Sequence, residues 1–279
     1  MKEKLILVAK GFIIGIANII PGVSGGTLAI TLGIYEKLIE AISHFLSNFK
    51  ENIKFLVPVG LGIILSLLLL SNVIGYSLDH FPVPTVFFFI GLILGGIPML
   101  MKKVKGEYQK ASNLIIFLIM FVAVASFAFL KSGSNVVSFE NMDLMKYIML
   151  FVAGVIAAGT MVIPGISGSF MLMLMGYYEP IINTIRSLTH LENIAGNILI
   201  LFPFGIGVLI GIILVAKIIE YLLKKFEIKT YFAILGFVLA SIISILMGLG
   251  DTNITVLNTI IGLLFGFIGF VIAYILGEK

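Results

Sequence analysis

A short motif rich in proline, glycine and serine interrupts two apolar stretches of this chain, IIPGVSGGTLAI at residues 19–30 and VIPGISGSFMLM at residues 162–173. Between residues 21–36 and 164–179, at an offset of 143, seven of sixteen positions are identical. At an offset of 145 the match resumes, because the pattern Pro-x-Gly-x-Gly at 58–62 recurs at 203–207. The chain is therefore a tandem duplication, and such an internal repeat dictates the architecture of the protein.

The composition places this duplication in a membrane. Of 279 residues, 60% are hydrophobic and 11% are charged, whereas roughly a quarter of the residues in soluble proteins are charged. A helix needs ~20 apolar residues to cross a ~30 Å hydrocarbon core. Six segments reach or approach that length, at residues 54–77, 84–101, 112–130, 197–223, 230–249 and 253–276. The other apolar segments form two pairs joined by the motifs, and we expect them to be re-entrant hairpins at 5–47 and 145–188.

The duplication and the basic residues together predict the topology. The first repeat covers residues 1–135 and the second covers residues 136–279. Each repeat has an odd number of crossings, whether its hairpin re-enters or both arms cross, so the second repeat enters from the opposite face. With the N-terminus inside, fifteen of the eighteen basic residues lie at or near the cytoplasm, as the positive-inside rule requires. We predict an all-α polytopic membrane protein of two inverted-topology repeats, with both termini cytoplasmic.

The motif predicts that one helix ends and another begins. Proline disfavours helical geometry in the residue before it, and glycine permits backbone angles closed to other residues. Ser24 and Ser167 are good N-caps, and the unpaired amides and positive dipole end of a helix start attract anions. The predicted anion site comprises Pro21, Gly22, Ser24, Gly25, Gly26, Thr27, Pro164, Gly165, Ser167, Gly168 and Ser169. The alternative is that these small residues only allow close helix packing.

Three charged residues of the hairpins each have two interpretations. Glu36 and Glu179 occupy equivalent places in YEK and YEP, where they either carry a proton or stabilise solvated helix ends. The twelve helical residues from Ser24 to Glu36 span ~18 Å. If the turn at Ser24 lies near the midplane of the bilayer, Glu36 lies close to the interface, which favours the second role. Arg186, the one arginine of the chain, is either a phosphate ligand on the outer side or an interfacial residue placed there by chance.

Metal, thiol and nucleic-acid chemistry is not expected. The chain has no cysteine and its three histidines show no metal-like spacing, so we predict neither a metal nor another cofactor. The net charge of +4 fits contact with anionic lipid headgroups rather than nucleic acid. The N-terminal apolar segment lacks an A-x-A-like cleavage site, so we expect it to be retained.

The paired segments PGVSGGTLAITLGIYE and IPGISGSFMLMLMGYYE resemble those of the PopT-type polyprenyl-phosphate transporter family, long catalogued as a bacterial membrane domain of unknown function. The resemblance covers essentially the whole chain, although Ser169 and Phe170 stand where the first motif has Gly26 and Thr27. It implies a flippase of the bacterial cytoplasmic membrane that returns undecaprenyl phosphate, the carrier lipid of cell-wall (peptidoglycan) synthesis, to the inner leaflet. The phosphate would then lie between the two opposed helix starts.

Two other classes of protein share parts of this pattern. Undecaprenyl-pyrophosphate phosphatases resemble it in their inverted repeats and a Pro-Gly-x-Ser motif, but arginine and serine follow that motif and catalytic glutamates precede it. Here Gly25 and Gly26 stand where the phosphatases have that arginine and serine, and residues 5–20 contain no acidic residue. We therefore expect that this protein is not an enzyme. A carrier or channel for a small anion stays open as an alternative, since half-helix anion sites look similar.

Overall fold

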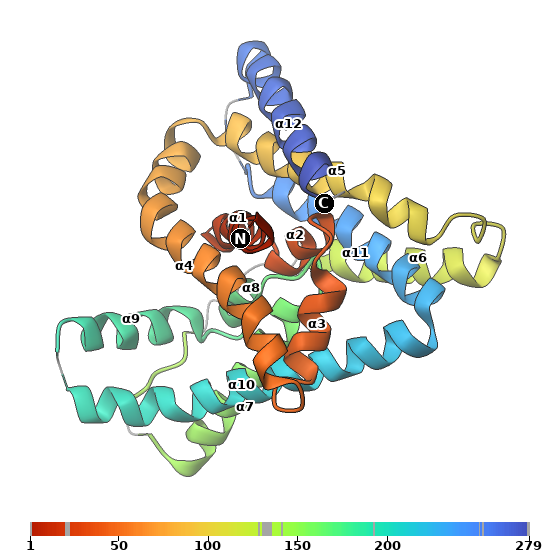
Figure 1. Cartoon of the computed structure of the whole chain (residues 1–279). Helices are drawn as coiled ribbons and strands as arrows, with labels where there is room; N and C mark the ends of the chain where they lie inside the picture. Colours follow the sequence, from red (N-terminus) through yellow and green to blue (C-terminus); the bar gives the residue numbers. More distant parts are fainter. Residues whose placement is uncertain are drawn as a thin grey trace.

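The computed structural model describes residues 2–19, 23–127, 129, 136–140, 142–191, 193–250, 252 and 254–277, and this part of the chain is helical without strands (Figure 1). The first half forms α1 (Lys2–Ile19), α2 (Gly25–Thr31), α3 (Tyr35–Ser43), α4 (Phe49–His80), α5 (Pro82–Lys103) and α6 (Ala111–Phe127). The second half forms α7 (Leu144–Val162), α8 (Gly168–Leu174), α9 (Tyr178–Thr189), α10 (Ile194–Lys225), α11 (Glu227–Met247) and α12 (Val256–Gly277). The predicted all-helical architecture is confirmed for the described residues.

The order and lengths of the helices follow the duplication in the sequence. The short helices α2 and α8 have 7 residues each, and the long helices α4 and α10 have 32 residues each. Pro58 and Pro203 lie inside those long helices at the same position. Gly33 and Gly176, with φ of 70° and 75°, turn the chain after α2 and α8. Glycine adopts this left-handed conformation without steric cost, so both turns have the same cause.

The first helix of each hairpin approaches the long helix that follows it at backbone distance. A methyl group added at Gly62 of α4 would lie 2.1 Å from the carbonyl oxygen of Val8 in α1. The same addition at Gly207 of α10 would lie 2.1 Å from the carbonyl oxygen of Phe151 in α7. Glycine permits this approach because it has no Cβ, as in other membrane helix pairs.

Helices from opposite halves also pack against each other, so the halves share one core. Helix α5 packs along α12, and α6 packs along α11. A methyl group at Gly91 of α5 would lie 1.9 Å from the carbonyl oxygen of Gly266 in α12, and one at Gly236 of α11 would lie 2.5 Å from that of Phe117 in α6. The second half therefore completes the packing surface of the first.

Six helices of the described chain are long and apolar enough to cross a membrane: α4, α5, α7, α10, α11 and α12. Five of them coincide with predicted spans. The sixth predicted span, α6, has 17 described residues, whereas α7, the first arm of the second hairpin, has 19. Helices α2 and α8 are only ~10 Å long at 1.5 Å per residue, so neither crosses the bilayer alone. The re-entrant course of the hairpins stays a prediction.

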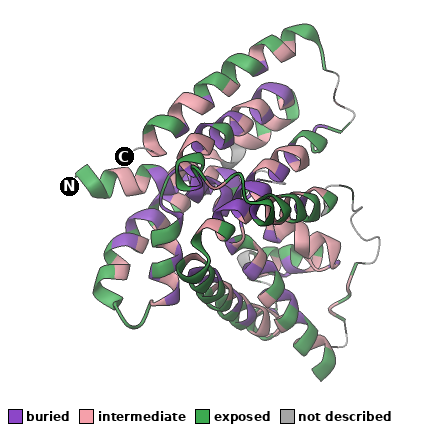
Figure 2. Cartoon of the chain, turned by 90° about the vertical axis from the view of Figure 1, so that its right-hand side faces the viewer, coloured by how far each residue is buried: buried purple, intermediate pink, exposed green. Residues whose placement is uncertain are grey.

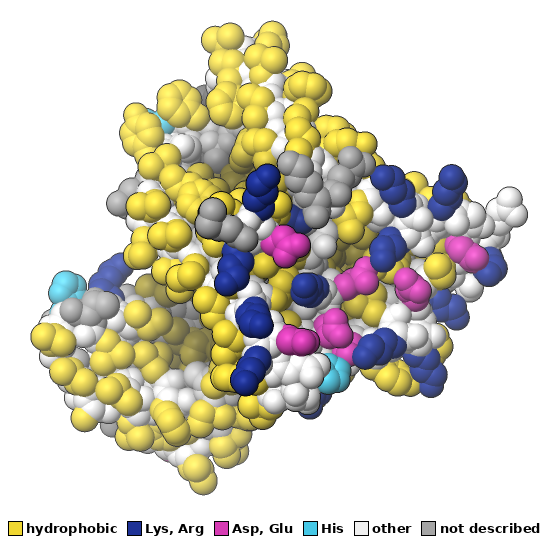
Figure 3. Space-filling model, viewed as in Figure 1, with side chains coloured by type: hydrophobic (Ala, Val, Ile, Leu, Met, Phe, Trp, Pro, Cys, Tyr) yellow, Lys and Arg dark blue, Asp and Glu magenta, His cyan; other side chains and the backbone are white. Residues whose placement is uncertain are grey.

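Both termini lie on the same side of the molecule in the two ribbon views (Figures 1 and 2). Lysine, arginine and acidic side chains gather on the face that carries these ends, while hydrophobic side chains cover most of the remaining visible surface (Figure 3). Buried residues concentrate at the centre, and exposed ones follow the outer sides of the helices (Figure 2). This distribution suits a bilayer around the molecule, and the charged face is the one predicted to be cytoplasmic.

Candidate functional site

The two motifs form matching helix starts. Ser24 is the N-cap of α2 with φ −96° and ψ 126°, and Ser167 is the N-cap of α8 with φ −93° and ψ 126°. Both serines hold the predicted N-cap positions, but neither side chain makes a capping hydrogen bond. An N-cap leaves the first amides of its helix without intrahelical partners, so each motif offers N–H donors at its start. Pro21 and Gly22, which belong to the predicted site, lie outside the described residues.

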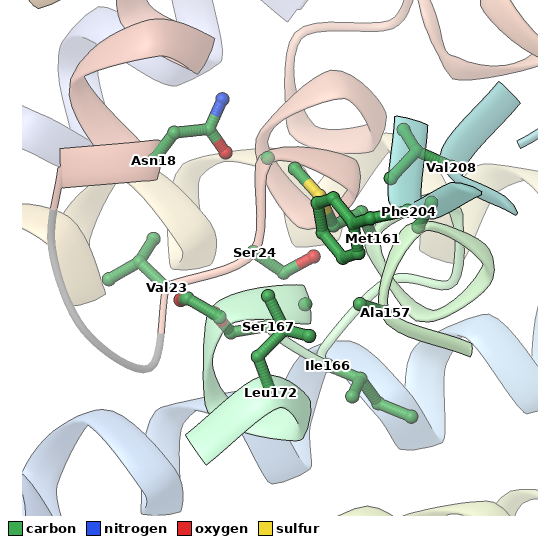
Figure 4. A pocket seen from close by; sticks show the side chains of 14 residues that line it. Asn18, Val23, Ser24, Ala157, Met161, Ile166, Ser167, Leu172, Phe204 and Val208 are labelled. Carbon is green, nitrogen blue, oxygen red and sulfur yellow. The ribbon is translucent and has the colours of Figure 1, made fainter. Parts of the chain in front are cut away.

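A cavity of 280 Å³ lies where the two helix starts meet (Figure 4). This volume far exceeds the ~10–15 Å³ that one ordered water needs. The wall is contributed by the end of α1, both motifs, α7, α8 and α10. It consists of Asn18, Val23, Ser24, Gly25, Ala157, Ala158, Met161, Ile166, Ser167, Gly168, Ser169, Leu172, Phe204 and Val208. All its polar side chains are neutral, which leaves hydroxyl, amide and backbone N–H groups to meet a ligand.

The hydroxyl of Ser24 has no hydrogen-bond partner among the described residues, although the residue is only 2% exposed. Leaving a buried polar group unpaired costs about 1–3 kcal/mol. Across the cavity, the hydroxyls of Ser167 and Ser169 bond to each other at 2.8 Å. Figure 4 shows Ser24 and Ser167 on two short segments that face the same space. The cavity therefore holds one donor that a ligand would satisfy.

Other motif residues connect the two halves directly. The Gly165 amide donates to the hydroxyl of Thr27 at 2.7 Å, and the hydroxyl of Tyr35 donates to the carbonyl of Val162 at 2.9 Å. A methyl group at Gly26 would lie 3.3 Å from the Val162 carbonyl oxygen, so α2 packs closely on the turn after α7. Thr27 and Gly165 thus bond to each other across the motifs, while Ser24 and Ser167 line the cavity.

Thr27→Val is expected to lower the free energy of unfolding by about 1–3 kcal/mol, because it leaves the buried Gly165 amide without its acceptor. Thr31→Val is the matched control in the same helix. The hydroxyl of Thr31 donates to the Leu28 carbonyl, which keeps its helical bond from Leu32. Thermal unfolding in detergent measures both variants. Equal losses would show that the bond between the motifs adds no stability of its own.

The structure separates the three charged candidates from the cavity. Glu36 pairs with Lys103 of α5 at 2.9 Å and accepts a hydrogen bond from the hydroxyl of Tyr231 in α11. Glu179 is exposed in the first turn of α9, and Arg186 is exposed in its last turn. The described cavity wall contains none of these three charged residues. Glu36 has the contacts of a helix-end residue, and the roles of Glu179 and Arg186 stay predictions.

Partial burial raises the pKa of the Glu36 carboxyl, but the hydrogen bonds from Tyr231 and Lys103 and the charge of Lys103 outweigh this and lower it overall. A carboxyl with a lowered pKa stays ionised at neutral pH. Its contribution to stability is therefore present above the ordinary glutamate value of about 4.3 and is lost as the pH falls through the lower folded value. This direction disfavours proton transfer by Glu36 near neutral pH.

Glu36→Gln is accordingly expected to leave the pH dependence of transport near neutrality unchanged and to lower stability by less than about 1 kcal/mol, the size of an exposed ion pair. Measuring substrate exchange across a neutral pH series, beside Glu179→Gln, tests this expectation. A shift of the pH profile in Glu36→Gln alone would assign the proton to Glu36 after all.

Comparisons with known proteins identify the family of the chain. A sequence profile of the undecaprenyl phosphate translocase-like family matches residues 14–260. The chain belongs to this family. It is 36% identical to a polyprenyl-phosphate transporter of Staphylococcus aureus over 278 residues, 99% of this chain and 96% of that protein. It is 30% identical to a polyprenyl-phosphate transporter of Vibrio cholerae over 247 residues, 84% of this chain and 74% of that protein. No solved structure gives a significant match.

Family membership confirms the resemblance stated from the sequence, and the structure adds residues that this resemblance did not supply. Asn18 of α1 lines the cavity, and its side-chain oxygen would lie 2.8 Å from a methyl group added at Gly25. Met161 occupies the equivalent place in the second half, where its Cγ would lie 2.4 Å from a methyl group added at Gly168. The sequence does offer one indication of this role, because Asn18 is a lone polar residue near the end of an apolar segment. Lys10, one of the fifteen basic residues predicted to lie at or near the cytoplasm, is buried and donates to the Leu32 carbonyl at 2.7 Å.

Proposed function

We propose that this protein is a flippase that moves undecaprenyl phosphate, or a related polyprenyl phosphate, across the bacterial cytoplasmic membrane for reuse of the carrier lipid. The phosphate binds in the cavity between the starts of α2 and α8. One observation carries the proposal: the buried hydroxyl of Ser24, without a partner among the described residues, lines the same cavity as Ser167. The names of the two relatives support the lipid class.

The cavity suits a phosphate for three reasons. Phosphate oxygens accept hydrogen bonds from hydroxyls and from the amides of helix starts, and both are present. The helix dipoles of α2 and α8 favour negative charge at their N-termini. The surrounding wall is mostly apolar, which strengthens each of these interactions relative to water. The prenyl tail stays outside this cavity, at the depth of the bilayer hydrocarbon.

The proposed architecture is two inverted repeats, 1–135 and 136–279, with re-entrant hairpins and cytoplasmic termini. Matching helix lengths, matching glycine turns and termini on one charged face support it. Inward movement of one negative charge against an inside-negative potential costs ~2.3 kcal/mol per 100 mV, and a phosphate monoester carries up to about two charges. Proton co-transport, or pairing of the phosphate with Arg186, would offset this cost.

Two observations favour transport over the rival activities. Neutral side chains line the described cavity, whereas a lipid pyrophosphatase of the similar motif holds its phosphate with an arginine. The two relatives are named as transporters of a lipid phosphate, which favours a lipid over a small inorganic anion. Anionic phospholipids around the charged face that carries both termini would be accessory partners.

Leaflet exchange in liposomes tests the proposal. We expect the purified protein to accelerate exchange of a polyprenyl phosphate and to leave the matching polyprenol at the protein-free rate. Exchange of the phosphate at the protein-free rate would contradict the proposal. Phosphate release from polyprenyl pyrophosphate would favour the phosphatase, and chloride or phosphate flux without lipid exchange would favour the small-anion carrier.

A further inference from the structure

A second and larger cavity, of 560 Å³, lies between α6, α10 and α11. We call it the α10–α11 groove. Its wall is almost entirely apolar and consists of Tyr35, Ile116, Met120, Ile163, Pro164, Val215, Ile218, Ile219, Leu222, Phe226, Lys229, Thr230, Ala233, Ile234 and Phe237. Ile218 is 49% exposed, so the groove opens toward the surrounding lipid. Its size and lining suit a branched hydrocarbon chain.

The groove and the motif cavity follow each other along α10. The motif cavity contacts Phe204 and Val208, and the groove begins at Val215, ~10 Å further along the helix. Between them lies the turn of the second motif, because Ile163 and Pro164 belong to the groove wall. A lipid could therefore have its tail in the groove while its phosphate lies on either side of this turn.

The groove carries one charged side chain among its described lining residues, Lys229 in the first turn of α11. Lys229 is exposed and lies near the end of α10. The fold does not require a lysine there. The first half builds the same connection between α4 and α5, where Thr85 bonds the carbonyls of Ser77 and Phe81.

Thr230 bonds the equivalent carbonyls of Leu222 and Phe226 in the second half. At the offset of 145 the counterparts of Lys224, Lys225, Glu227 and Lys229 are Asp79, His80, Pro82 and Pro84, so the two connections share their hydrogen bonds and differ in their charges. Of these charged residues Lys229 is the one that lines the groove, and a cation at the mouth of an apolar groove attracts an anionic headgroup.

We propose that the α10–α11 groove binds the isoprenoid tail of the polyprenyl phosphate on the cytoplasmic side, with the Lys229 ammonium holding its phosphate. This inference rests on the proposed function and adds a second position for the same lipid. The isoprenoid tail enters the groove from bilayer hydrocarbon rather than from water, so its shape and packing against the wall, and not the hydrophobic effect, select it. A phosphate monoester carries more negative charge than the diester of an ordinary phospholipid, so Lys229 favours the monoester. Movement of the phosphate past the Pro164 turn connects the two positions.

The absence of cysteine from the chain allows a direct test. Ala233→Cys places one thiol in the groove wall, and a lipid-soluble maleimide labels it in phosphatidylcholine nanodiscs. We expect a polyprenyl phosphate to slow labelling about tenfold more than the matching polyprenol or a straight-chain alkyl phosphate does. This factor corresponds to the free energy of one hydrogen bond to a charged group. Lys229→Gln in the same background should remove the difference between the phosphate and the alcohol. Met120→Cys, on α6 across the groove, repeats the test with a second thiol.

Two matched variants serve as controls. Leu209→Cys is a lipid-exposed position on α10 outside the groove, and its labelling should not respond to the polyprenyl phosphate. Lys225→Gln removes a neighbouring lysine that bonds to Tyr221, and selective protection should survive it. Equal protection by all three lipids, or protection that survives Lys229→Gln, would overturn the groove assignment. Leaflet exchange by the unmodified protein separates the two proposals: exchange without groove protection rejects the groove alone, and groove protection without exchange rejects transport alone.

Discussion

Ser24→Ala is expected to slow the exchange of polyprenyl phosphate roughly 10- to 100-fold while leaving the protein as stable as before, or about 1 kcal/mol more stable. The loss of exchange follows because a hydrogen bond to a charged group contributes about 1.5–3 kcal/mol. The gain in stability follows because the Ser24 hydroxyl is buried and has no partner within the described chain. The measurements are leaflet exchange in liposomes and thermal unfolding in detergent.

Ser241→Ala is the matched control for this variant. Ser241 is also buried, but its hydroxyl donates to the Val238 carbonyl at 2.7 Å and lies outside the cavity wall. Exchange should be unchanged in the control. If Ser24→Ala exchanges lipid at the normal rate, the hydroxyl does not bind the phosphate, and if it also loses stability, the residue serves packing.

Gly62→Ala and Gly207→Ala are each expected to lower the free energy of unfolding by about 1–3 kcal/mol, the usual effect of overpacking. In both cases the new methyl group would lie 2.1 Å from a backbone carbonyl oxygen of the preceding hairpin helix. A backbone atom cannot move aside as a flexible side chain does, so the two helices must separate. The midpoint of thermal unfolding in detergent should fall by at least about 2 °C in each variant.

Gly60 and Gly205 provide controls two residues away on the same helices. A methyl group at either position meets nothing within 4 Å, so alanine there should be neutral or stabilise the helix by up to about 1 kcal/mol. A large loss in both controls, or a loss at Gly62 without one at Gly207, would contradict the equivalent packing of the two halves.

The all-helical fold and the N-cap positions of α2 and α8 could be predicted from the sequence because they depend on local chemistry. Apolar runs define helices in a membrane, and a serine after a Pro-Gly turn indicates where the next helix begins. The offset of 143 also predicts that Ser24 and Ser167 occupy equivalent positions. These inferences needed only neighbours in the chain.

Tertiary contacts could not be predicted in the same way. Nothing in the segment around Thr27 indicates that its hydroxyl accepts from Gly165, 138 residues away. The pairing of Glu36 with Tyr231 and Lys103 depends equally on packing between α3, α5 and α11. The burial of Lys10 is a further example, because lysine usually prefers water and the packing around α1 nevertheless buries it.

The position of the phosphate is the central claim, and backbone labelling tests it most directly. The chain contains three Ser-Gly pairs, Ser24–Gly25, Ser132–Gly133 and Ser167–Gly168, so carbonyl-¹³C serine with ¹⁵N glycine selects only three amides. A hydrogen-bonded amide nitrogen lies about 3 Å from a phosphate oxygen, close enough for solid-state NMR to detect ³¹P beside it.

We expect ³¹P of a bound polyprenyl phosphate to dephase the ¹⁵N signals of Gly25 and Gly168 and to leave Gly133, which belongs to neither motif, unchanged. With Ser24→Ala, dephasing at both motif glycines should weaken together because they share one ligand. Saturating lipid without dephasing at either motif glycine would contradict the phosphate site between α2 and α8.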